Sequence, residues 1–287
     1  MGCEMSSNTR STLRPPATPT LEQSPAKLPT TRSHPRVQEA LQQSFEEGDY
    51  AFLLVLLSDS TPEEVTEPFP KWAEPPQTLG CAALAVLNRQ FRHGTVLFAP
   101  GSLMQCRDLI LASLEQSRTA LSQHILYFCY KLGKQGDVAF LQELANNGLF
   151  QSIFKLLTRP RPIFFLYTMK LVALMLENSP QAKPQFVEAG GVEKCLHIMR
   201  GTRGRGLGFV DTLRAFLALI RRPGGGIEAK YAEPILAGFK EIDIDQLQLH
   251  SLNTSQRHIF NKFIQKLLDA KTAYDDSTSL STPPHSR

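Results

Sequence analysis

The sequence predicts an all-α protein made of stacked helical repeats, an α-solenoid, and three observations support this. First, residues 140–222 contain one helical unit twice, offset by about 42 residues, so that Gly148 falls on Gly190 and Phe154 on Leu196. Second, each copy holds a short helical pattern, a basic break rich in Pro or Gly, and a longer helical pattern. Third, the longer pattern of the first copy is apolar nearly all round, so it needs cover that only stacked neighbours supply.

The first copy shows the helical spacing most clearly. Phe150, Ile153, Phe154 and Leu157 recur at i, i+3, i+4 and i+7, which predicts one buried face of a short helix. The longer helix is expected over 164–177. Both patterns recur in the second copy.

The segment that joins the two copies resembles the junction between armadillo repeats. It begins Asn178-Ser-Pro and ends Phe186-Val-Glu-Ala-Gly-Gly-Val192, and glycine suits the sharp turn that such a junction needs. The resemblance implies a right-handed armadillo-like α-solenoid of about four to five repeats, clearest over 140–222. At the positions where peptide-threading armadillo proteins carry an inner-helix Asn, near 174–175 and 216–217, this chain is apolar, which argues against that binding mode.

The remaining helices are expected on both sides of the double unit. The helical domain as a whole is predicted to span 37–272, between disordered tails at 1–36 and 273–287 that are rich in Ser, Thr and Pro. Its other predicted helices cover 37–57 with an interruption at Gly48, then 79–92, 102–115, 118–133, 229–242 and 254–272.

The N-terminal tail carries a pattern typical of lipid attachment. Removal of Met1 would expose Gly2, Ser6 stands where the myristoylation pattern wants Ser or Thr, and Cys3 is placed for S-palmitoylation. One myristoyl chain gives marginal membrane binding and a second acyl chain makes it stable. The tail holds five basic residues against two acidic ones, which favours an anionic leaflet. We therefore predict acylation at Gly2 and Cys3; the alternative is that the match arises by chance.

An acidic, Pro-rich stretch at 58–78 interrupts the helical pattern, and it contains Trp72, the single tryptophan. We favour a solvated insertion between helices, with Trp72 folded back on the solenoid. A docking loop for a basic partner is the alternative.

Composition and motifs indicate no catalytic chemistry. The chain has 42% hydrophobic residues and a net charge of +4, too small to demand nucleic acid. Its five cysteines show no paired spacing and are expected to be buried thiols. Leu207 replaces the lysine of a phosphate loop in the Gly-rich run 201–208, and His124 and His197 stand alone. We therefore predict a protein that is not an enzyme and has no cofactor or metal site.

Arginines gather in the break between the two helices of each repeat copy. Equivalent loops of a solenoid stack on one edge, so these arginines are expected to form a basic strip for acidic peptides or lipid headgroups. Ordinary solvated turns are an equal alternative. The predicted strip consists of Arg159, Arg161, Arg200, Arg203 and Arg205.

These observations together predict an adaptor held on a membrane. The layout is similar to acylated armadillo proteins of the yeast vacuole and of apicomplexan secretory organelles, which tether organelles or bind motor-linked partners. The resemblance implies protein partners, a cytosolic membrane face of the plasma membrane or an organelle, and no nucleic acid. The alternative is a soluble armadillo-like scaffold without lipid, for cytoskeletal, ciliary or transport partners. The sequence leaves the oligomeric state open.

Overall fold

The computed structural model is all-α. It describes residues 34–59, 78–94, 96–115, 119–157, 162–202, 208–222, 224, 226–240 and 252–279, which belong to one compact unit within 31–287. Within these ranges no β-strand forms, and Arg221 and Ile227 make an isolated antiparallel bridge. The predicted fold class, all-α, is confirmed.

The helices that the apolar periodicity predicts are present, and the structure adds two short ones, α7 and α10, that it did not predict. Their bounds are α1 Pro35–Glu47, α2 Ala51–Val55, the 3-10 helix η1 Leu56–Ser58, α3 Leu79–His93, α4 Ser102–Gln105, α5 Arg107–Glu115, α6 Thr119–Gln135, α7 Val138–Asn146, α8 Leu149–Leu156, α9 Pro162–Asn178, α10 Ala182–Glu188, α11 Gly191–Thr202, α12 Phe209–Ile220, α13 Ala229–Lys240 and α14 Thr254–Ser279.

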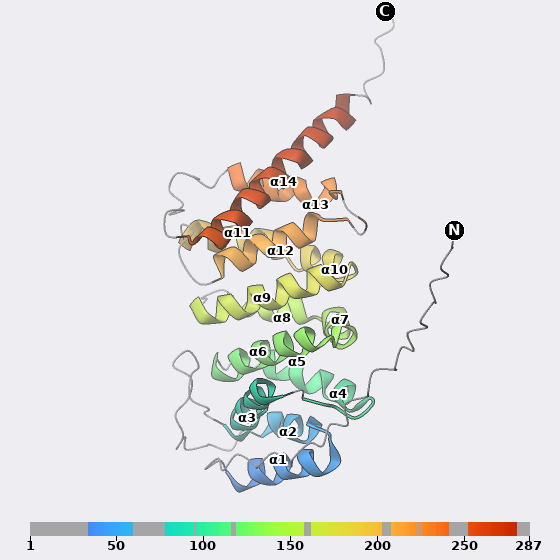
Figure 1. Ribbon diagram of the computed structural model, residues 1–287, viewed down its shortest axis with the longest axis vertical. Helices are drawn as coiled ribbons and strands as arrows, with labels where there is room; N and C mark the ends of the chain where they lie inside the picture. Colours follow the sequence, from blue (N-terminus) through green and yellow to red (C-terminus); the bar gives the residue numbers. More distant parts are fainter. Residues whose placement is uncertain are drawn as a thin grey trace, which may run out of the picture. The chain divides into compact units, whose positions relative to one another are not determined.

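The helices stack in two parallel layers (Figure 1). In the long-helix layer α3, α6, α9, α12 and α14 pack each against the next, and in the short-helix layer α5, α8, α11 and α13 do the same. The helices α7, α8 and α9 form one complete three-helix repeat, and α10, α11 and α12 form the next. The described part of the chain thus contains five long-layer helices, which agrees with the predicted four to five repeats.

Two glycines explain how successive repeats join. Gly148 and Gly190 precede α8 and α11 at equivalent positions, and their φ angles of 94° and 73° are left-handed, where a β-carbon is disfavoured. The next residue, Gly191, allows close packing, because a β-carbon there would lie 2.6 Å from Cε2 of the Phe186 ring. The predicted use of Gly190 and Gly191 for a sharp turn is confirmed.

The core runs continuously through the stack. The predicted stripe of Phe150, Ile153, Phe154 and Leu157 is buried. Helix α9, predicted to need cover on several sides, packs against α6, α7, α10 and α12. Four of the five cysteines are described, and all four are buried thiols, as predicted: Cys81, Cys106, Cys129 and Cys195.

Several predicted boundaries were wrong. The helix expected over 37–57 begins two residues earlier, at Pro35. Its predicted interruption at Gly48 is confirmed, because Gly48 leaves helical geometry and Asp49 then accepts a hydrogen bond from the backbone NH of Ala51, at the start of the next helix. The pattern at 102–115 is divided at Cys106 into α4 and α5. The last helix does not end at 272 but continues to Ser279, into the segment predicted as a tail.

Candidate functional site

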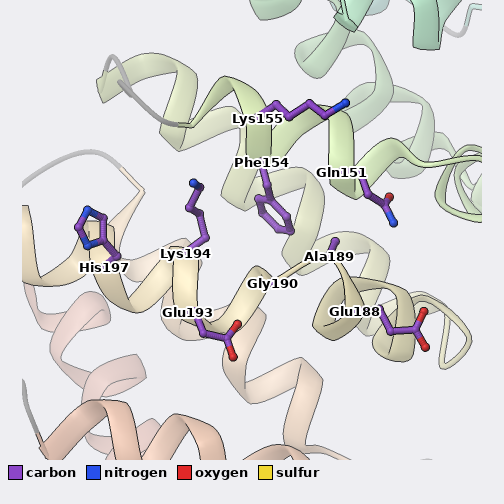
Figure 2. Close-up of a pocket in the computed structure, with 9 residues that line it drawn as sticks. All are labelled: Gln151, Phe154, Lys155, Glu188, Ala189, Gly190, Glu193, Lys194 and His197. Carbon is purple, nitrogen blue, oxygen red and sulfur yellow. The ribbon is translucent and has the colours of Figure 1, made fainter.

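Two surfaces of the repeats are candidates for binding, and the first is a hollow in the short-helix layer. It has a volume of about 780 Å³ and lies between α8, the end of α10 and the start of α11. Figure 2 shows Phe154 in the space between α8 and α11, with Lys194 and His197 on one side of it and Glu188 on the other. We call this site the α8–α11 hollow. Its lining residues are Gln151, Phe154, Lys155, Glu188, Ala189, Gly190, Glu193, Lys194 and His197.

The charges of the α8–α11 hollow are balanced, because Lys155 and Lys194 are matched by Glu188 and Glu193. Its apolar floor is part of the core. The Phe154 side chain is buried and packs edge-on against the Phe186 ring, with ring centroids 5.6 Å apart. The hollow therefore offers neither a strong field nor an open apolar pocket.

The second candidate lies on the long-helix layer, where tyrosines and basic side chains of successive repeats meet. We call it the Tyr–Lys surface. It consists of Arg92 on α3, Tyr127, Tyr130, Lys131 and Lys134 on α6, and Tyr167 and Lys170 on α9, with Asp211 and Arg214 of α12 at its edge.

The lysines of this surface lie over aromatic rings. The rings of Tyr127 and Tyr167 cross edge to face, with centroids 5.0 Å apart, and join α6 to α9. Lys131 Nζ lies 5.4 Å from the Tyr127 centroid. Lys170 Nζ lies 5.5 Å from the Tyr167 centroid and 6.0 Å from that of Tyr130, so it bridges the two helices. Cations at these distances from a ring face are attracted by its quadrupole.

The edge of the Tyr–Lys surface carries a carboxylate that is already paired. The guanidinium of Arg214 donates to Asp211 Oδ1 at 2.9 Å, while burial raises the pKa of Asp211 above its usual range and the charges of Arg214 and Lys170 oppose that rise. Burial also raises the pKa of Tyr167, and the nearby charge of Arg92 acts against it. The charge of Arg92 thus acts on Tyr167, and those of Lys170 and Arg214 act on Asp211.

The buried nucleophilic and basic groups are poorly suited to catalysis. Burial raises the pKa of the Cys106 thiol to about 11 and that of Cys129 to about 12, so neither is a thiolate near neutral pH. Burial lowers the pKa of His124 to about 4. In the residues that the structure describes, no three His, Cys, Asp or Glu side chains are grouped to hold a metal ion. No described helix has both the length and the apolarity to cross a bilayer.

Most of the predicted site residues lie outside the described residues. These are Gly2 and Cys3 in the tail, Trp72 in the acidic insertion, and Arg159, Arg161, Arg203 and Arg205 of the basic strip. Of that strip the structure describes Arg200, which is exposed near the end of α11, one turn beyond His197. The basic strip and the acylation sites remain predictions.

The sequence did contain a signal for the Tyr–Lys surface, which sequence reasoning missed. Tyr127, Tyr130, Lys131 and Lys134 recur at i, i+3, i+4 and i+7, and this spacing puts them on one face of α6. An offset of about 40 residues brings Tyr127 onto Tyr167 and Tyr130 onto Lys170. Tyr127, the first of these residues, is buried.

Comparisons with known proteins agree on the fold. An armadillo repeats only protein from Plasmodium falciparum is similar in structure, with a TM-score of 0.59 and 13% identity over 82% of this chain and 98% of that one. Two engineered proteins with crystal structures give TM-scores of 0.57 and 0.56 at 13% and 14% identity, covering 81% and 86% of this chain and 84% and 57% of theirs. No protein-family model matches the chain, and no curated protein sequence does either. The likeness shows an armadillo-like helical repeat fold.

Proposed function

We propose that this protein is an armadillo-like adaptor that is anchored to a membrane by its N-terminal tail and recruits a protein partner through its helical repeats. The observation that carries the anchoring is the combination of Gly2, Cys3 and Ser6 at the head of a basic tail. Two acyl chains give the stable attachment that one chain does not. The proposed location is the cytosolic face of the plasma membrane or of an organelle.

The recruiting half of the proposal is supported by the fold and by the Tyr–Lys surface. Helical repeat proteins work through extended surfaces built from equivalent positions of neighbouring repeats. The Tyr–Lys surface has that form, because α3, α6 and α9 each contribute a basic side chain to it. Tyrosine and arginine are also among the residues enriched where proteins bind one another.

The anchoring is tested by the intact mass of the N-terminal peptide from eukaryotic cells that express the full chain. We expect the mass of a myristoyl group on Gly2 and a second, hydroxylamine-labile acyl group on Cys3. The Gly2→Ala chain should lack both groups and move from the membrane to the supernatant fraction. The Cys3→Ser chain should keep the myristoyl group and bind membranes weakly and reversibly.

A retained Met1 or an unmodified Gly2 in the wild-type chain would refute the anchoring. The protein would then be a scaffold without lipid, for example for cytoskeletal, ciliary or transport partners. Its Tyr–Lys surface would still be the first surface to test for a partner.

A further inference from the structure

We propose that the chain forms a homodimer in which the α14 helices of two copies pair in antiparallel fashion along their open faces. The inference goes beyond the proposed function. It is independent of the acyl anchor, since the residues concerned belong to the last helix of the stack.

Helix α14 has two faces of different kinds. On one face Phe260, Phe263 and Leu267 are buried, and α14 packs there against α12 and α13. On the other face Leu268 is 52% exposed, and Ile264, one turn before it, is half-buried. In Figure 1 the C-terminal half of α14 extends beyond the other helices. The open face is therefore within reach of a second copy.

The open face has the spacing of a coiled-coil seam. Its positions recur at alternating steps of four and three residues, which is the heptad spacing that lines one side of a helix. We call this row the α14 seam, and its first four members are exposed or half-buried. Because α14 continues to Ser279, the same register includes two later positions. The seam consists of Arg257, Asn261, Ile264, Leu268, Lys271 and Asp275.

The α14 seam is self-complementary in the antiparallel direction. Its six members form three pairs that stand two, five and nine residues before and after Lys266. With a two-fold axis at that level, Ile264 of one copy meets the partner's Leu268, and Arg257 meets the partner's Asp275. Each contact occurs twice by symmetry. Aliphatic side chains thus meet at the centre, and opposite charges meet at both ends.

Charge selects the antiparallel pairing over the parallel one. In a parallel pair each member of the seam would meet its own copy, so that Arg257, Lys271 and Asp275 would each face a like charge. In the antiparallel pair the guanidinium of Arg257, a fork of five N–H donors, meets a carboxylate. The Nε of Arg257 donates to the backbone carbonyl of Leu252 at 3.1 Å, which fixes the guanidinium near the start of the seam.

The length of the α14 seam predicts a weak dimer. From Arg257 to Asp275 the helix is about 27 Å long at 1.5 Å per residue, and only Ile264 and Leu268 are aliphatic. Such an interface lies at the small end of specific complexes, so we expect a micromolar dissociation constant. A dimer brings two N-terminal tails to one particle, which would strengthen the membrane attachment of the proposed function.

The experiment uses the full chain purified from bacteria, which lack the acylating enzymes, and sedimentation velocity from about 1 µM to about 200 µM. We expect the sedimentation coefficient to rise from that of a monomer to that of a dimer and no further, since a two-fold interface closes. Leu268→Glu should weaken dimerisation about tenfold or more, because it places charge at the centre of the seam. Lys262→Glu, at an exposed position of α14 outside the seam, should leave the dissociation constant within about twofold.

Charge exchange tests the register. Asp275→Arg and Arg257→Glu should each weaken the dimer about fivefold or more, because two attractions become repulsions. Combining them should return the dissociation constant to within about twofold of the wild type, since the ion pairs re-form with reversed polarity. Thermal unfolding shows whether each variant is folded. If Arg257→Glu is not, the register is tested by Asp275→Arg alone.

Four results would overturn the inference: a monomer at every concentration, a dimer that Leu268→Glu leaves intact, a dimer that Asp275→Arg leaves intact, or a folded double exchange that is no tighter than the single variants. A chain that fails to be acylated in eukaryotic cells leaves these measurements unchanged. A monomeric chain leaves the mass of the N-terminal peptide unchanged, so the two proposals fail separately.

Discussion

The Tyr–Lys surface and the α8–α11 hollow are built from the same repeats, yet they differ in what surrounds their lysines. In the hollow, Lys155 and Lys194 share the lining with Glu188 and Glu193. On the Tyr–Lys surface the lysines lie over aromatic rings. A carboxylate cancels the field of a lysine, whereas a ring preserves it. The partner of each basic residue, more than the number of basic residues, therefore sets how strong a positive field a face of the repeats presents to an anionic ligand.

The largest expected loss in the free energy of unfolding comes from truncating a ring in the floor of the hollow, and truncating a ring of the Tyr–Lys surface should cost less. Phe186 is fully buried, and its ring contacts those of Phe150 and Phe154. Phe186→Ala should lower the free energy of unfolding by about 3–5 kcal/mol, because a large cavity forms. Tyr167→Ala, at a half-buried ring, should lower it by clearly less. Urea unfolding followed by circular dichroism measures both, and equal losses would contradict the view that the hollow is floored by core.

A second comparison concerns lysines in different environments. Lys183 of α10 is 5% exposed in its side chain, and its Nζ lies 2.9 Å from Glu228 Oε1 and also donates to the carbonyl of Arg221. Lys183→Met leaves the partly buried carboxylate of Glu228 with a more distant described partner, Lys230 Nζ at 3.9 Å, and we expect a loss of about 2–3 kcal/mol. Lys170→Met should cost about 1 kcal/mol or less, since this lysine is half-buried and lies over the Tyr130 and Tyr167 rings. Urea midpoints of the two variants test this difference.

The Glu228→Gln variant is the control for that experiment. If the cost of Lys183→Met comes from the Glu228 carboxylate that has lost its closer partner, combining it with Glu228→Gln should restore part of the stability. A double variant no more stable than Lys183→Met alone would show that the packing of the lysine stem, rather than the ion pair, stabilises this junction.

The third prediction concerns pH and the buried His124 of the long-helix layer. Its folded-state pKa is lowered from 6.5 to about 4 by burial, so as the pH falls the unfolded chain takes up the proton first. The stability is fully present above about pH 6.5 and is lost as the pH falls toward 4, by up to about 3 kcal/mol. Urea unfolding of His124→Gln at pH 7 and pH 5 should show a weaker pH dependence than wild type. The His197→Gln variant, at an exposed histidine, serves as the control. If the free energy of unfolding changed equally between pH 7 and pH 5 in the wild type and in His124→Gln, the prediction would be contradicted.

The repeat itself could be predicted from sequence because its determinants are local. Gly148 and Gly190 fall at the same offset as the apolar stripe that begins at Phe150, and the chain needs only short-range geometry to use them. The break after Glu47 was predicted at Gly48 for the same reason. The extension of α14 to Ser279 was missed because that segment is polar and lacks the apolar stripe by which helices were identified.

The candidate site was harder to predict because its contacts join different repeats. Lys170 meets Tyr130 across 40 positions, and Lys183 meets Glu228 across 45. Each residue alone is an ordinary polar residue on a helix. Only the stacking register between neighbouring helices brings them together, and an offset of 40 rather than 42 residues changes which side chains meet. The arginines of the predicted strip were noticed because they are clustered in sequence, which is a different property from clustering in space.

The smallest expected effect tests directly whether rings hold the lysines of the Tyr–Lys surface. A double-mutant cycle of Lys170→Met and Tyr167→Leu isolates their interaction, and we expect a coupling of about 0.5–1 kcal/mol in the free energy of unfolding. Lys194→Met with Phe154→Leu in the hollow is the matched cycle, and there we expect a coupling smaller than that of the Lys170–Tyr167 cycle. If the two cycles gave equal couplings, the rings would not distinguish the two faces, and the positive charge of the Tyr–Lys surface would depend on composition alone. A larger coupling for Lys170 would show that the Tyr167 ring positions its ammonium group before any ligand arrives.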